Sequence, residues 1–96
     1  MAVNVDVKLI GAFRVFSGKD SVVLKLEKPV VGEAVEKIAE FLPSESKRML
    51  IDPELDDPRP NALILVNGKE ISVLEGLETK VKEGDRIILI PISHGG

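Results

Sequence analysis

The 96-residue chain has no cysteine, no tryptophan and no tyrosine, and it has a single histidine. The absence of cysteine excludes disulfide bonds, thiolate catalysis and cysteine-rich zinc sites. One histidine and three phenylalanines leave little material for acid–base catalysis or for stacking on nucleic-acid bases. The composition therefore favours a protein that is handled by other proteins over one that acts on a substrate alone.

The chain also lacks an excess of positive charge and a long apolar run. Its net charge is −3, so it has no basic stripe of the kind that binds nucleic acid. The longest apolar run, near residues 87–92, is far too short to span a bilayer, and MAVNVDVKLIG at the start does not read as a signal peptide. We expect one cytoplasmic domain that binds neither nucleic acid nor membrane.

The first half of the chain contains two predicted strands and one predicted helix. Apolar and polar residues alternate over residues 3–9 and again over residues 22–27, with a turn cluster, SGKD, at residues 17–20. This pattern predicts a hairpin with a short turn. Over residues 31–42 the apolar residues recur at helical spacing, and Pro43 ends the predicted helix.

Residues 44–60 are the least regular part of the sequence. Ser44 is a candidate cap for a short helical turn. The acidic residues that follow invite a calcium site, but an EF-hand loop needs a central glycine and alternate oxygen ligands, and here Pro53 and Leu55 interrupt the series. A solvated loop without metal is the favoured interpretation.

The second half predicts a hairpin and a central strand. Asn67-Gly68 between two apolar runs indicates a two-residue hairpin turn. The last predicted strand, residues 86–92, is apolar on both faces, so it should be paired on both sides. Placing it in parallel beside the first strand gives an α+β fold, the ubiquitin-like β-grasp, with a mixed sheet of four to five strands and one main helix.

One helix covers only one face of such a sheet. The last strand therefore leaves one apolar set exposed, either Ile87 and Leu89 or Ile88 and Ile90. A contiguous exposed apolar patch usually marks a partner surface. The alternative, in which residues 73–81 or 44–60 fold back over this face, stays open.

Four segments carry a resemblance to a known family. They are VKLIGAFRVFSGKD at residues 7–20, VVGEAVEKIAEFLP at 30–43, VNGKEI at 66–71 and LEGLETKVKEGDRIILIPISHGG at 74–96. Together they resemble the molybdopterin synthase small subunit and its relatives, the thiamine-pathway sulfur carrier and the ubiquitin-related modifier. The likeness covers nearly the whole chain, and the ending SHGG looks more like the His-Gly-Gly of the ubiquitin-related modifier.

The resemblance implies a carrier that is not itself an enzyme. It implies a β-grasp domain over residues 1–92 and a flexible tail over residues 93–96, made of Ser93, His94, Gly95 and Gly96. A partner E1-like adenylating enzyme would adenylate the carboxylate of Gly96, and a sulfur donor would convert it to a thiocarboxylate. ATP and sulfur would come through that partner, with no cofactor and no metal bound to the chain.

The resemblance also implies a docking surface and a receiving pathway. Partner-binding residues would be Ile88, Ile90 and Ile92, and a second partner would be the molybdopterin synthase large subunit, in molybdopterin or tungstopterin biosynthesis. Arg14 is a further candidate, which could contact an acidic group of a partner or serve only as a structural or solvated residue. The same activated C-terminus could instead serve tRNA thiolation or a ubiquitin-like protein modifier. A non-reactive adaptor that binds through its sheet alone is the third alternative.

Overall fold

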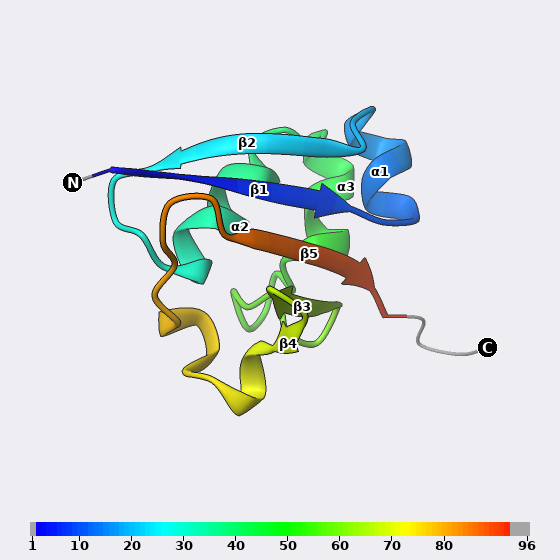
Figure 1. Cartoon of the computed structure of the whole chain (residues 1–96). Coiled ribbons are helices and arrows are strands. Elements are labelled where there is room, and N and C mark those ends of the chain that lie inside the picture. Colours follow the sequence, from blue (N-terminus) through cyan, green and yellow to red (C-terminus); the bar gives the residue numbers. More distant parts are fainter. Residues whose placement is uncertain (1, 93–96) are drawn as a thin grey trace.

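The computed structural model describes residues 2–92, which form a five-stranded mixed sheet with helices packed against it (Figure 1). The elements in chain order are β1 (Val3–Leu9), α1 (Ala12–Ser17), β2 (Ser21–Leu26), α2 (Val31–Ala39), α3 (Ser44–Leu50), β3 (Ala62–Val66), β4 (Lys69–Glu70), the 3-10 turns η1 (Ile71–Val73) and η2 (Gly76–Glu78), and β5 (Arg86–Pro91).

The strand order is β2-β1-β5-β3-β4, which confirms the predicted β-grasp. β5 lies at the centre, parallel to β1 and antiparallel to β3. Its position explains its inward residues, which are apolar because they pack under the helices. Ile87 and Leu89 are fully buried beneath the helices.

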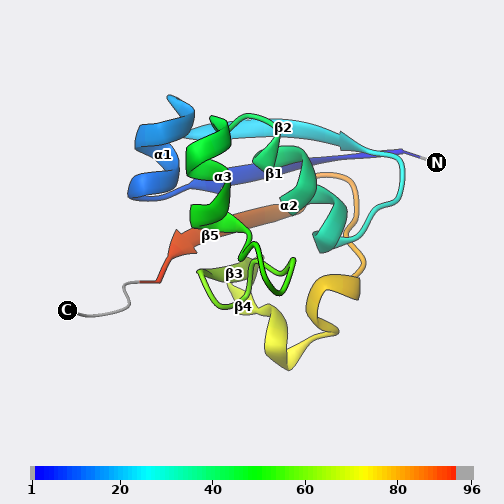
Figure 2. The ribbon, with the colours of Figure 1, turned by 180° about the vertical axis from the view of Figure 1, so that it is seen from behind.

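The helices lie on one face of the sheet. In Figure 1, β1, β2 and β5 face the viewer with no helix in front of them, and Figure 2, from behind, shows α2 and α3 across the same strands. The inner face of the sheet and the apolar stripe of α2 form one core. We call the opposite side of the sheet the outer face.

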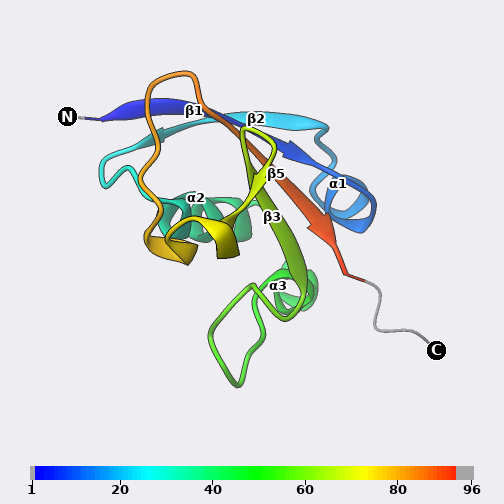
Figure 3. The ribbon, with the colours of Figure 1, turned by 60° about the horizontal axis from the view of Figure 1, so that its bottom comes forward.

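The two segments that could have covered the outer face lie on the helix side instead. Leu77, in η2, packs on α2, and its carbonyl oxygen would be 3.3 Å from a Cβ at Gly32. Ile51 and Pro58 line a small hollow together with Gly32 and Leu77. Figure 3 shows the η1–η2 segment, coloured yellow to orange, beside α2. The outer face is therefore not covered by residues 44–60 or 73–81.

The connection between β1 and β2 differs from the prediction. The two strands do pair antiparallel, but helix α1 joins them in place of a short turn. Gly11 and Gly18 bracket this helix with φ angles of +57° and +74°, and Gly18 N–H donates to the carbonyl of Arg14. A six-residue helix has little intrinsic stability. It is held by Phe13, which is 1% exposed, and this tertiary contact was not visible in the local pattern.

Two helix ends also differ from the prediction. α2 ends at Ala39, and Phe41 and Leu42 continue as a tighter turn, with their N–H groups bonded three residues back. Ser44 is the first residue of α3, and the residue before it, Pro43, makes no side-chain cap. The Asn67-Gly68 hairpin is confirmed, with φ angles of +48° and +85°.

Candidate functional site

The outer face carries an apolar patch on its two central strands. Ile88 and Ile90 of β5 point outward, opposite the buried pair Ile87 and Leu89. In the β3–β5 ladder Leu65 pairs with Ile88 and Leu63 pairs with Ile90, and all four are half-exposed. We call Leu63, Leu65, Ile88 and Ile90 the apolar patch. The structure thus places Ile88 and Ile90 on the outward set, and the two leucines of β3 join them.

The patch arises because successive side chains along a strand point to opposite faces of the sheet. A strand at the centre of the sheet buries every second residue, and only four outward positions on β3 and β5 are both apolar and central. Their neighbours on β1 are polar, because Lys8 pairs with Ile88 and Asp6 with Arg86. The outer face is therefore divided into an apolar half on β3 and β5 and a charged half on β1 and β2.

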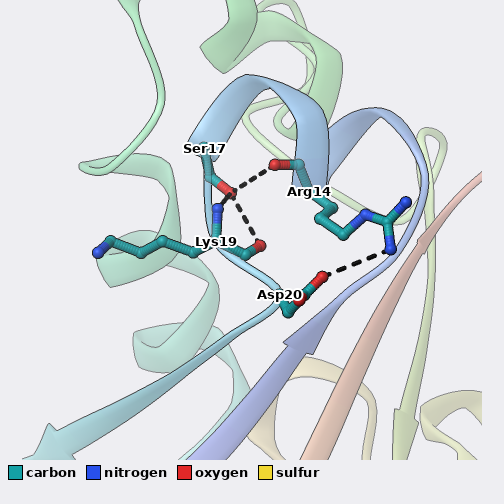
Figure 4. Close-up of polar contacts among 4 residues, drawn as sticks. All are labelled: Arg14, Ser17, Lys19 and Asp20. Atoms are coloured by element: carbon teal, nitrogen blue, oxygen red, sulfur yellow. Dashed lines mark hydrogen bonds and ion pairs between the residues drawn. The ribbon is translucent and has the colours of Figure 1, made fainter.

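The charged half contains Arg14. A shallow hollow of about 370 Å³ is lined by Asp6, Lys8, Arg14, Asp20, Ser21 and Arg86. Arg14 Nη1 lies 3.4 Å from Asp20 Oδ1, and Arg86 Nη2 lies 3.1 Å from Asp6 Oδ2. Figure 4 shows Arg14 on α1 reaching down to Asp20 at the start of β2. The structure thus places Arg14 on the outer face beside the charged hollow, across β1 from the apolar patch.

The turn after α1 positions Asp20 for this contact. The Ser17 hydroxyl accepts from the backbone N–H of Lys19 at 3.2 Å and lies within donating distance of the carbonyls of Arg14 and Lys19 (Figure 4). Both partners of the Arg14–Asp20 pair are largely exposed, so the pair adds little to stability. These charges are therefore available to a partner.

The end of β5 is held from both sides. On the β1 side, Ile10 N–H donates to the carbonyl of Leu89 at 3.1 Å. On the β3 side, Ile92 N–H donates to the carbonyl of Asn61 at 2.9 Å, and the Asn61 side chain donates to the carbonyl of Arg48 in α3. The last strand is thus fixed to the body of the domain up to Ile92.

Ile92 lies at the end of the apolar patch and is 40% exposed. With Leu63 and Ile71 it lines a separate hollow of about 180 Å³ at the edge of β3. The predicted tail residues Ser93, His94, Gly95 and Gly96 lie outside the described residues. The structure therefore gives the positions of the predicted partner-binding residues, and the tail stays a prediction.

In the acidic loop between α3 and β3, Asp52 and Asp57 accept hydrogen bonds from other residues of the same loop. Asp52 Oδ1 accepts from the backbone N–H groups of Glu54 and Leu55 at 2.9 and 3.0 Å. Asp57 accepts from the side chain and backbone of Arg59, and the Arg59 hydrogen bond lowers the pKa of Asp57 below its usual value. Residues 2–92 contain no group of three potential metal ligands. No helix in that range has the length and apolar character needed to cross a membrane.

Comparison with known proteins places the chain in a family. The sequence model of the Urm1 (ubiquitin related modifier) family matches residues 4–96. A protein from Archaeoglobus fulgidus, named as a candidate sulfur carrier, is 32% identical over 71 residues, which cover 73% of this chain and 77% of the relative.

Solved structures agree with this placement. The small archaeal modifier protein 1 from Methanosarcina acetivorans is 27% identical with a TM-score of 0.85, covering 100% of this chain and 99% of the other. A chain in the BexX/CysO complex of Amycolatopsis orientalis is 26% identical with a TM-score of 0.73, covering 96% and 99%. The profile match, the relative and the shared β-grasp agree, and the chain belongs to the ubiquitin related modifier family of small ubiquitin-like sulfur carriers and modifiers.

Proposed function

We propose that this protein is a sulfur carrier whose Gly96 carboxylate is adenylated by a partner E1-like enzyme and converted to a thiocarboxylate. The observation that carries the proposal is that β5 bears part of the apolar patch and also leads directly to the tail. One central strand bears the outward Ile88 and Ile90, and its hydrogen bonds reach Leu89 on the β1 side and Ile92, four residues before Gly96, on the β3 side. A partner that docks on the apolar patch therefore holds the base of the tail at a fixed place.

The chemistry needs no catalytic group in this chain. A carboxylate oxygen of Gly96 attacks the α-phosphorus of ATP, pyrophosphate leaves, and an acyl-adenylate forms. The sulfur of a sulfide-level donor then attacks the carbonyl carbon, and AMP departs with one original carboxylate oxygen. The partner supplies ATP and sulfur, which is consistent with a chain that has no cysteine.

The two terminal glycines suit a tail that enters a narrow channel. Gly95 and Gly96 have no Cβ, so they fit between close walls and adopt any backbone angle that the channel requires. Ordering four tail residues costs about 1–2 kcal/mol each. Burial of the apolar patch, at roughly 25 cal/mol per Å², offsets that cost. Docking is thus assigned to the outer face of the sheet, and reaction to the tail that follows β5.

We propose molybdopterin or tungstopterin biosynthesis as the receiving pathway, with the molybdopterin synthase large subunit as the receiving partner. The support is the resemblance of residues 7–20 and 30–43 to the small subunit of that enzyme. The BexX/CysO complex supports the general point that a relative of this chain assembles with a partner protein.

A second candidate is conjugation to lysine side chains of other proteins. The family description, ubiquitin related modifier, and the likeness to a small archaeal modifier protein favour it. An acyl-adenylate or thiocarboxylate at Gly96 is the shared precursor of both uses, so the fate of the activated terminus distinguishes them.

The deciding experiment is intact-mass spectrometry after incubation with ATP, the cognate adenylating enzyme and a sulfur donor. Replacement of one oxygen by sulfur, located by fragmentation at Gly96, is the expected result, and deletion of Gly96 is the matched control. An unchanged mass with an enzyme proven active on another carrier would contradict the proposal. Immunoblots of cell extract test conjugation, since a ladder of products that disappears when Gly96 is deleted would favour the modifier.

A further inference from the structure

Strand β2 is an edge strand, and no other element of the described residues pairs with its free edge. It pairs with β1 on one side only, and it stands at the end of the strand order (Figure 1). It contains no proline, and Ser21, Val23 and Lys25 are all exposed, Val23 to 71%. Natural sheets usually shield a border strand of this kind, because its free N–H and C=O groups can pair with another chain.

The alternation of hydrogen-bonded pairs between β1 and β2 shows which backbone groups of β2 are free. Leu9 N–H donates to the carbonyl of Asp20 at 2.8 Å, and this pair continues the ladder in which Lys8 lies opposite Ser21. In an antiparallel ladder bonded pairs alternate, so Val22, Leu24 and Leu26 direct their backbone groups toward β1. Ser21, Val23 and Lys25 direct their backbone N–H and C=O groups away from β1, toward the free edge of the sheet. Within residues 2–92 none of these three residues has a backbone partner on that edge.

The sequence of this edge is complementary to itself. We propose that two copies of the chain pair through β2, antiparallel and centred on Val23, to form a continuous sheet. In this register Val23 faces Val23 of the second copy, and Ser21 faces Lys25. These pairs exchange six main-chain hydrogen bonds about the two-fold axis, counted from the alternation of bonded pairs.

Charge complementarity selects this register. Lys19, in the turn before β2, and Glu27, in the bend just after β2, flank the paired segment. The same pairing therefore brings Lys19 close to Glu27 of the second copy at one end, and the symmetry repeats the pair at the other end. Both residues are exposed, and neither makes an ion pair with any residue in the part of the chain that the structure describes. Figure 4 shows the Lys19 side chain directed away from Arg14 and Asp20. No like charges face each other in the register, and Lys25 lies opposite an uncharged serine.

The dimer leaves the docking surface open. The apolar patch lies on β5 and β3, and β1 separates these strands from the β2 seam. Because the two-fold axis stands perpendicular to the sheet, both outer faces lie on the same side. The inference is independent of the proposed sulfur chemistry, since it uses none of the tail residues.

The test measures association of the full chain by sedimentation equilibrium from micromolar concentrations to about 1 mM, a range suited to a small interface. A concentration-dependent dimer is expected. In NMR spectra, the amides of Ser21, Val23 and Lys25 should change with concentration, and those of Val22 and Leu24 should not. A chain that stays monomeric over the whole range would overturn the proposal.

Charge reversal tests the register. Glu27→Lys alone and Lys19→Glu alone should each raise the dimer dissociation constant by about fivefold to tenfold, since each variant places like charges at both ends. The double variant K19E/E27K should restore the original constant. Within one copy the two residues sit at opposite ends of β2, so the rescue has no intramolecular explanation. A dimer that neither single variant weakens would assign the contact to another surface and overturn the proposal.

Val23→Pro tests the main-chain bonds. It removes an N–H group that faces away from β1, so the domain should fold, as checked by circular dichroism, and dimerisation should be lost. Val23→Thr keeps the N–H group and the side-chain shape, and it should still dimerise. If the proline variant fails to fold, the charge-reversal pair decides.

Discussion

Gly11 lies directly against Pro91, so that a Cβ built on Gly11 would stand 3.1 Å from Pro91 Cγ. Gly11 also has a φ of +57°, which L side chains rarely adopt. The residue that precedes α1 therefore packs against Pro91, the last residue of β5, which comes one position before Ile92. The connection between the first two strands thus helps to fix the point from which the tail departs.

Gly11→Ala should destabilise the domain by about 2 kcal/mol, measured as the free energy of unfolding in urea. About half of this arises from the positive φ, and the rest from the contact with Pro91. Gly18→Ala is the comparison variant, because Gly18 also has a positive φ, +74°, and a Cβ added there would meet nothing within 4 Å. Its ψ is +15°, in the left-handed helical region that alanine tolerates better than the ψ of −128° at Gly11. Equal losses in the two variants would show that the Pro91 contact costs nothing.

Ile90→Lys should leave the fold intact and weaken binding of the cognate adenylating enzyme by about tenfold or more, as measured by calorimetric titration. The side chain is half-exposed on the outer face, so a lysine can reach solvent while its charge disrupts an apolar contact.

Two other lysine variants serve as controls for Ile90→Lys. Val73→Lys, at a residue that is 72% exposed in η1, should bind normally. Leu89→Lys should unfold the domain, because Leu89 is fully buried. Normal binding by Ile90→Lys would show that the apolar patch does not bind the adenylating enzyme.

Arg59→Gln should reduce stability at neutral pH and lose that effect in acid. The Arg59 hydrogen bond lowers the pKa of Asp57 in the folded state, so its stabilising contribution is present above the unfolded pKa and is lost as pH falls through the folded pKa. Urea unfolding of both proteins between about pH 7 and pH 2 should give curves that converge at the acid end. A difference that stays constant across this range would assign the Arg59 effect to packing.

Gly96→Ala should abolish sulfur transfer and leave the free energy of unfolding unchanged. In the proposed function the added methyl group would meet the walls of the partner's channel, whereas the core and the strand ladders that the structure describes lie within residues 2–92. The paired measurements are thiocarboxylate formation by mass spectrometry and urea unfolding. Full transfer by the alanine variant would argue against a narrow channel.

Local sequence patterns predicted the strands and the second hairpin correctly. The period of two over residues 3–9 and 22–27 and the Asn67-Gly68 pair each describe an interaction between near neighbours. The double apolarity of β5 predicted its central position, and the strand order confirms that position. Pairing alone does not require the second apolar face, because β1 is also paired on both sides and its outer face is polar. Helix α1 was missed, because six residues between glycines give no periodic signal and Phe13 anchors them only in the folded core.

The sequence by itself determined the fold class and the family resemblance, since each depends on residue order alone. Only the tertiary structure decided which apolar set of β5 faces outward, because alternation makes Ile87 with Leu89 and Ile88 with Ile90 equivalent until a helix covers one face. The tertiary structure also brought Arg86 to Asp6 and exposed one edge of β2. Such relationships join residues far apart in the chain, and they exist only after strands have paired and helices have packed.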